Sequence, residues 1–265
     1  MVLSSYENVV LNNGMKYLPN NHFVSVYNET DWREEASLLK TQFNFTSQNE
    51  NASYDIGCGS TQRPTNTEKL YEVPAQKWAD ITDENNGFGV SVFSDSRAGW
   101  DKPDKSSLRL TVVHTPMVNY RWECSQHIMD MGLNRYSFAI MGHSGGCDNV
   151  QTFAERFCQP MHTFITDRHT GSGTEFSFVK TDNEKVRITA IKKAQNSDDI
   201  ILRVTETSGE DQKDVTITFA DLPLMAYEIR GDETQPEETG IYDGKLKFDI
   251  RHNSIKSFLL SFAEN

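Results

Sequence analysis

The pentapeptide GHSGG at positions 142–146 carries the residue types of a nucleophilic site. In hydrolases with a G-x-S-x-G turn, the serine sits between a strand and a helix, where a histidine and an acid activate it. Ser144 would be the nucleophile, with Asp167 and either His169 or His252 as partners. That fold needs repeated β/α units, which this sequence does not offer. We therefore favour Ser144 as an ordinary loop residue and keep a serine hydrolase as a remote alternative.

The histidines do not show the spacing of a metal site. None of the seven lies in an HxH, HxD or HExxH arrangement, and scattered histidines are more often ordinary polar groups than metal ligands. We expect no metal in this chain. A carboxylate pair for glycoside hydrolysis leaves no such local signal, because its two members can lie far apart in sequence. With 38 Asp and Glu residues, no pair can be singled out.

The polar stretch SDSRAGWDKPDKSS at 94–107 places Arg97 and Trp100 between two alternating segments. An exposed Trp can stack on a sugar face, and an Arg can donate hydrogen bonds to hydroxyls. The flanks, 88–93 and 108–115, alternate apolar and polar residues, so we predict that they pair as a hairpin. Hairpin loops usually have about 2–5 residues, so a loop of this length suggests a function. The competing interpretation folds both side chains back over the sheet.

The composition argues against some classes of binding partner and favours one cellular compartment. The formal net charge of -12 argues against nucleic acid or an anionic membrane as a partner. No apolar run is long enough to cross a membrane, and the start MVLSSYENVV lacks the features of a signal peptide, which favours the cytoplasm. The cysteines are widely spaced, which predicts buried free thiols rather than disulfides or a zinc site; they are Cys58, Cys124, Cys147 and Cys158.

Several segments up to residue 142 alternate apolar and polar residues as strands do. We predict strands at 23–28, 38–46, 52–59, 88–93, 108–115 and 135–142. One helical pattern follows, because Val150, Phe153, Ala154 and Phe157 share one helix face, and Pro160 ends it. Asp148 is the predicted N-cap, with Gln151 closing a capping box. Trp32 and Trp78 lie beside strand-like segments, and we predict that they pack in the core.

After about residue 176 the alternation resumes at the spacing of a small β-sandwich. The predicted strands are 186–191, 200–207, 215–220, 226–230, 246–250 and 257–262. Asp243-Gly244 predicts a two-residue hairpin turn. The polar stretch 167–175 is the expected boundary. We therefore predict an all-β protein with a larger domain over 1–170, which holds one short helix near 148–158, and a smaller sandwich over 176–265.

Several segments, taken in chain order, resemble the C-terminal region of glycoside hydrolase family 38, the α-mannosidases. They are VYNETDWREEASLLKTQFNF (26–45), STQRPTNTEKLYEVPAQKWADIT (60–82), GFGVSVFSDSRAGWDKPDKSSLRLTVVHTP (87–116), DMGLNRYSFAIMGHSGG (130–146) and the tail from 186. Each is moderately specific, and their collinearity makes the resemblance strong. The chain departs from the pattern at Arg97-Ala98-Gly99-Trp100, at Met141-Gly142 before His143, and at Asn134, where the pattern has His.

The resemblance implies a large antiparallel β-sandwich of the super-sandwich, galactose-mutarotase-like type, followed by a smaller C-terminal β-sandwich. It implies the non-catalytic β portion of a zinc-dependent retaining enzyme that hydrolyses terminal α-mannosides. The zinc and the Asp nucleophile of such an enzyme belong to an N-terminal α/β domain, which a three-helix bundle follows. We find neither in this sequence, so we predict a fragment that is inactive alone and holds no cofactor. A stand-alone carbohydrate-binding or scaffolding module is the alternative.

The resemblance also implies partners and a site. The missing catalytic domain of the same polypeptide would be the partner, and α-mannoside glycans would be reached through it. Phe88, Asp95, Arg97 and Trp100 are then the predicted substrate-binding residues, on an exposed, mobile loop that faces the cleft. The β region of the family has further strands before residue 1, so bare core or edge surface would favour a homo-oligomer.

Overall fold

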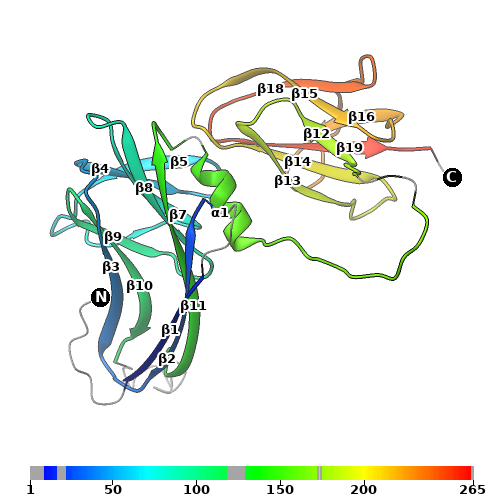
Figure 1. The fold of residues 1–265 in the computed structure, drawn as a ribbon. Helices are drawn as coiled ribbons and strands as arrows, with labels where there is room; N and C mark the ends of the chain where they lie inside the picture. The colour runs from blue at the N-terminus through cyan, green and yellow to red at the C-terminus, as the bar shows by residue number, and fades with distance from the viewer. Residues whose placement is uncertain are drawn as a thin grey trace. The chain divides into compact units, whose positions relative to one another are not determined.

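The computed structural model describes residues 9–16, 22–117, 129–147, 149–171, 173 and 175–263, with the first of these ranges described by its backbone. The described chain is nearly all β (Figure 1), which confirms the predicted fold class. It divides into two compact units: the larger comprises the residues up to Gly57 and Thr61–Met161, and the smaller comprises Cys58–Ser60 and the residues from His162 onward. No helix among the described residues is long and apolar enough to cross a membrane.

The larger unit contains two antiparallel sheets. The seven-stranded sheet runs in the order β1 (Val9–Lys16), β2 (Val24–Trp32), β11 (Gly132–Ser144), β8 (Phe88–Ser94), β7 (Trp78–Asp83), β4 (Asn51–Asp55) and β5 (Ser60–Pro64). The four-stranded sheet runs in the order β3 (Ser37–Asn44), β10 (Ser107–Thr115), β9 (Gly99–Asp104) and β6 (Val73–Pro74). Apolar side chains from both sheets, among them Trp100, Leu110 and Phe138, form one core between them.

The helix α1 (Val150–Cys158) covers the other face of the seven-stranded sheet. Its Val150 and Ala154 pack against Trp78, which is 2 % exposed, and against Met141. The Nε1 atom of Trp78 donates to the Oε1 atom of Gln151 at 2.6 Å. β7 therefore has a core on one side and a helix on the other, and its residues are buried nearly without alternation.

The predicted helix is confirmed, and it ends two residues before Pro160. The predicted capping box does not form, because the Gln151 carboxamide bonds Trp78 and Glu155 instead of the backbone at the helix start. Asn149 is the N-cap residue and makes no side-chain cap bond. The predicted cap, Asp148, lies outside the described residues.

The predicted hairpin between 88–93 and 108–115 is wrong. β8 pairs with β7 and β11, whereas β10 belongs to the other sheet and pairs with β3 and β9. The stretch predicted as a long exposed loop contains β9, which forms its own hairpin with β10 and places Trp100 opposite Leu110. Only the residues between Ser94 and Gly99 remain as a connection, and they cross from one sheet to the other.

β9 is a strand although its sequence is rich in charge, because the rest of the sheet satisfies its buried Asp101. This carboxylate accepts from the Nε atom of Arg109 at 2.6 Å and from the Nδ2 atom of Asn66 at 3.1 Å, and it pairs with Lys40. The next residue, Lys102, is also fully buried, and its Nζ atom donates to the carbonyl of Asp104 at 2.6 Å. Burial lowers the pKa of Lys102 to about 8.

The smaller unit is a second sandwich. One sheet has the order β12 (Val179–Thr181), β15 (Gln212–Phe219) and β18 (Lys245–Ile250), and the other has the order β13 (Val186–Lys193), β14 (Ile200–Glu206), β19 (Ile255–Ser261), β16 (Met225–Ile229) and β17 (Glu237–Glu238). Val204, Ile217 and Phe258 lie in the core between them. The Asp243-Gly244 turn is confirmed: both residues have positive φ, 51° and 70°, as a type I′ turn requires.

We expect replacement of Lys102 by Met to stabilise the larger unit. A lysine pKa that is lowered in the native state means that the unfolded chain binds the proton more tightly. The loss of stability from burying the protonated Lys102 is therefore complete at pH 7. It decreases as the pH rises from about 8 to 10.5, the ordinary pKa of a lysine. Urea denaturation should show a gain of about 1–3 kcal/mol at pH 7 that shrinks at pH 10.

The matched control is Lys105→Met, because the Lys105 side chain is 61 % exposed and its loss should change stability little. A gain that is the same for both variants, or one that does not depend on pH, would contradict this account of Lys102.

Candidate functional site

The four residues predicted to bind substrate do not meet at one place. Phe88 begins β8 and lies opposite Ser144, whereas Asp95 directly follows the last residue of that strand. A strand of this length spans roughly 20 Å, so Phe88 lies at the opposite end of β8 from Asp95 and Arg97. Only Asp95 and Arg97 fall in the same neighbourhood.

Trp100 differs most from its prediction. Its side chain is 0 % exposed and packs in the core between the two sheets, so it offers no face on which a sugar could stack. The expectation of an exposed, mobile loop around it is therefore wrong. The physical reason is the pairing of β9 with β10, which turns Trp100 inward beside Leu108 and Leu110.

Asp95 and Arg97 form a polar cluster with two residues of β11, Asn134 and Tyr136, which we call the Arg97 cluster. The Oδ1 atom of Asp95 accepts from the backbone N–H of Ser137 at 3.1 Å. The Nη2 atom of Arg97 donates to the Oδ1 atom of Asn134 at 3.3 Å, and the guanidinium lies 5.6 Å from the centre of the Tyr136 ring. Burial raises the pKa of Tyr136, so the ring is neutral at ordinary pH.

The backbone around the Arg97 cluster is held by further bonds. The N–H of Arg97 donates to the Ser94 hydroxyl at 2.9 Å, and the Nδ2 atom of Asn134 donates to the carbonyl of Asp130 at 2.7 Å. The cluster thus presents an exposed carboxylate beside a half-buried guanidinium. Such a pair can accept from and donate to hydroxyl groups, but it contains no nucleophile with an activating base. Asn134 could have been selected from the sequence, because it departs from the family pattern.

A second polar network lies inside the seven-stranded sheet, around Asp80. Its side chain is fully buried and accepts three hydrogen bonds. The donors are the Thr82 hydroxyl on the same strand at 2.5 Å, the Ser91 hydroxyl on β8 at 2.6 Å and the Nε2 atom of His143 on β11 at 2.7 Å. Because a carboxylate only accepts, the Nε2 atom of His143 carries the proton of this bond. Asp80 therefore connects three neighbouring strands.

Gly89 makes room for the His143 ring in this network. A Cβ atom at position 89 would lie 2.4 Å from the Cε1 atom and 2.6 Å from the Nε2 atom of His143. No real Cβ atom approaches that closely, so any side chain here would push the imidazole away from Asp80. Packing against His143 therefore explains the glycine at position 89 near the start of β8, which the alternation of the strand alone does not.

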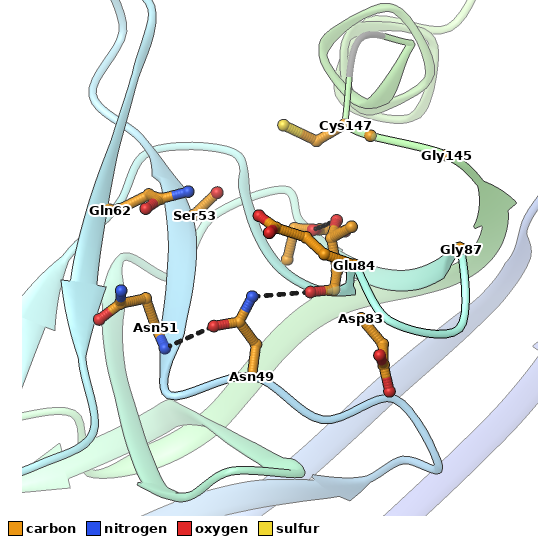
Figure 2. Close-up of a pocket in the computed structure, with 12 residues that line it drawn as sticks. Asn49, Asn51, Ser53, Gln62, Asp83, Glu84, Gly87, Gly145 and Cys147 are labelled. Atoms are coloured by element: carbon orange, nitrogen blue, oxygen red, sulfur yellow. Dashed lines mark hydrogen bonds between the residues drawn. The ribbon is translucent and has the colours of Figure 1, made fainter.

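A pocket of about 340 Å³ lies beside Asp80, where β4, β5 and the turn after β7 meet the segment 145–147 (Figure 2). Asn51, Ser53 and Gln62 line one side of it, and Glu84 lies opposite them. The backbone N–H of Gly145 donates to the carbonyl of Gly87 at 2.9 Å and closes the pocket on that side. This pocket has no counterpart in the sequence prediction, since its residues come from four separate segments.

The serine-hydrolase alternative is not supported. Ser144 ends β11, and α1 begins six residues later, but β11 is antiparallel to both of its neighbours, whereas the fold that uses a nucleophile elbow has a largely parallel sheet of repeated β/α units. Within the described part of the chain, no histidine is hydrogen-bonded to the Ser144 hydroxyl. The adjacent His143 bonds Asp80, and His252 bonds Asp211 at 2.8 Å in the smaller unit.

The described residues show whether any group of His, Cys, Asp and Glu side chains could bind a metal ion. Nowhere in them do three His, Cys, Asp or Glu side chains lie together as a metal site would need. The zinc that the family resemblance implies therefore does not fit the residues described here. Cys58, Cys147 and Cys158 are free of disulfides, and Cys124 lies outside the described residues.

Comparison with known protein families shows which family this chain is related to. Residues 7–119 match the glycosyl hydrolases family 38 C-terminal domain, and residues 185–258 match the glycosyl hydrolases family 38 C-terminal beta sandwich domain. The two matches fall in different units and together cover more than half of the chain. The chain belongs to glycoside hydrolase family 38. It corresponds to the C-terminal region of that family.

Individual relatives agree with this assignment. Alpha-mannosidase G of Dictyostelium discoideum is 25 % identical over 68 % of this chain and 16 % of its own length. Human alpha-mannosidase 2C1 is 24 % identical over 96 % of this chain and 24 % of its own length. The crystal structure of an alpha-mannosidase from Enterococcus faecalis V583 has the same fold over 96 % of this chain and 29 % of its own, with a TM-score of 0.77 at 11 % identity. The chain thus spans a quarter or less of the curated relatives it matches.

Two of the segments that resemble the family meet in the Asp80 network. Asp80 lies in the segment 60–82, and His143 lies in the segment 130–146. The structure brings the two segments together in the bond between Asp80 and His143, which is a buried structural contact.

We expect Gly89→Ala to destabilise the larger unit by about 2–4 kcal/mol, because the methyl group displaces the His143 ring and breaks its bond to Asp80. In a His143→Ala background the same substitution should cost at least about 1 kcal/mol less. Urea denaturation of the four proteins of this cycle measures the difference.

Gly142→Ala on β11 is the matched control, because no atom lies within 4 Å of the added methyl group. We expect it to change the free energy of unfolding by less than about 0.5 kcal/mol. If the losses in the free energy of unfolding for Gly89→Ala and His143→Ala are strictly additive, the position of the His143 ring does not depend on the glycine.

Proposed function

We propose that this chain is the C-terminal, non-catalytic β portion of a zinc-dependent retaining α-mannosidase that hydrolyses terminal α-mannosides. The observation that carries the proposal is that both units match C-terminal domains of one family. The relatives described above are named alpha-mannosidases, and this chain covers a quarter or less of them. The activity would therefore belong to a longer polypeptide of which this chain is one part.

The catalytic groups of the proposed enzyme would come from the rest of that polypeptide. A retaining mechanism needs two carboxyl groups about 5 Å apart, one as nucleophile and one as acid. Each buried carboxylate of the described residues is engaged by several donors, so none is available as a nucleophile; these residues are Asp55, Asp80, Asp83, Asp101 and Glu206. The role left to this chain is to support the catalytic domain and to border its cleft.

The Arg97 cluster is the part of this chain that we assign to the border of the cleft. It joins an exposed carboxylate, Asp95, to a guanidinium that is already oriented by Asn134 and Tyr136. A mannoside has several hydroxyls that both donate and accept, and this pair offers both functions. The cluster sits where β8 ends beside β11, so rigid strands hold it in place.

The supporting role has its own structural correlate on the smaller unit. Leu222, Leu224 and Tyr242 are 61 %, 67 % and 67 % exposed, and Leu222 lies 3.1 Å from the position of a Cβ atom on Gly244, two residues from Tyr242. Exposed apolar side chains can mark a surface that a partner covers when they lie close together, as Leu222 and the turn at Gly244 do. We assign that partner to the catalytic domain of the same polypeptide, with a second copy of the chain as the other occupant predicted from the sequence.

The test is kinetic and uses the longer polypeptide together with this chain expressed alone. The chain alone should not hydrolyse 4-nitrophenyl α-mannoside, whereas the longer protein should do so and lose the activity to a zinc chelator. In the longer protein, Arg97→Ala should lower kcat/KM by about ten- to a hundredfold, because a charged hydrogen-bond donor to the substrate is lost.

Arg135→Ala is the matched control. Arg135 lies on β11 between Asn134 and Tyr136, but its side chain is 72 % exposed and pairs with Glu29, so its loss should leave kcat/KM unchanged. Equal kinetics for Arg97→Ala and the wild type would remove the cluster from the cleft. A longer protein without chelator-sensitive mannosidase activity would refute the proposed function itself.

A further inference from the structure

The pocket beside Asp80 has a fixed frame. The Asn49 carboxamide donates to the carbonyl of Thr82 at 2.8 Å and accepts from the N–H of Asn51 at 2.9 Å, which ties β4 to β7 across the pocket floor (Figure 2). Asp83 fixes the turn by accepting from the backbone N–H groups of Asn85 and Asn86 at 3.1 Å each. The walls are therefore set before any ligand arrives, as in sites that are largely preformed.

Three polar side chains on these walls are left with unused hydrogen-bonding groups. Ser53, Gln62 and Glu84 make no side-chain hydrogen bond or ion pair with any described residue, and all three line the pocket. In Figure 2 the Gln62 carboxamide and the Ser53 hydroxyl stand on one side, facing the Glu84 carboxylate on the other. The Asn51 carboxamide turns away from them. Three side chains from three segments thus converge on one space.

The charge of the lining restricts the ligand. Asp80, Asp83 and Glu84 contribute carboxylates, and the described lining contains no Lys, Arg or His. The hydrogen bond from the Asn86 side chain holds the pKa of Asp83 below its usual range, so this carboxyl stays ionised. Phosphates and carboxylates are therefore repelled. The described lining also has no aromatic ring on which a nucleobase or another flat ligand could stack.

The hydrogen-bonding character of the lining selects between the remaining ligands. An ammonium group only donates, so it could bond the Glu84 carboxylate and the Gln62 carbonyl oxygen but could not use the Gln62 N–H groups. A hydroxyl group both donates and accepts, so neighbouring hydroxyls can donate to Glu84, accept from Gln62 and do either with Ser53. The volume of about 340 Å³ falls at the lower end of the range of pockets that hold small molecules.

We propose that this pocket binds a neutral polyhydroxylated small molecule through Ser53, Gln62 and Glu84. The proposal does not depend on the proposed function of the chain. It places adjacent hydroxyls of the ligand on the Glu84 carboxylate and the Gln62 carboxamide. It also accounts for polar side chains that are oriented toward one space yet have no partner among the described residues.

The experiment titrates the 15N-labelled chain with methyl α-D-mannopyranoside and with myo-inositol, and follows the Gln62 side-chain amide and the backbone amide of Gly145. Ethanolamine and inorganic phosphate serve as the cationic and anionic probes. We expect shifts with both polyols that saturate at millimolar concentrations, no binding of phosphate, and at least tenfold weaker polyol binding by Glu84→Gln.

Glu68→Gln is the control variant, because Glu68 is an exposed acid outside the pocket. It should bind both polyols as the wild type does. Three results would overturn the proposal: no shift at 100 mM polyol, tighter binding of ethanolamine than of either polyol, or equal loss in Glu84→Gln and Glu68→Gln. A thermal melt of each variant shows that a lost shift is not a lost fold.

Discussion

The larger unit depends on one buried carboxylate that must be fully hydrogen-bonded. Asp80 lies in the middle of a sheet whose two faces are both covered, so an unpartnered charge there would cost several kcal/mol. Its three donors come from β7, β8 and β11, which makes the order of these strands a condition for its burial. The absence of a side chain at Gly89 and the position of His143 both follow from that condition.

The position of these strands determines where functional groups can lie. The Arg97 cluster is formed because β11 is the neighbour of β8 and extends beyond the end of β8 at Ser94. The pocket is formed because the turn after β7 meets the segment after β11. The two sites therefore lie toward opposite ends of β8, with the Asp80 network between them. A protein of this design can border a large cleft at one end while a small ligand occupies the other, since rigid strands separate the two.

The sequence predicted many of the strands correctly but missed β7 and β9, for different physical reasons. β18 was predicted correctly because Lys245, Lys247 and Asp249 are exposed and alternate with buried residues. β7 was not recognised as a strand, because a helix and a second sheet cover its faces and remove the alternation. β9 was read as a loop because its charged residues suggest solvent, and only contacts far along the chain, such as that from Arg109 to Asp101, explain their burial. The bond between Asp80 and His143 joins residues 63 positions apart, and no local pattern could show it.

Hydrogen–deuterium exchange of Asp80→Ala tests most directly whether this carboxylate holds the larger unit together. The account predicts that protection falls together across β7, β8 and β11, while the strands of the smaller unit keep theirs. If protection is lost only within a residue or two of position 80, or is unchanged, the strands are held by apolar packing alone and Asp80 does not organise the sheet.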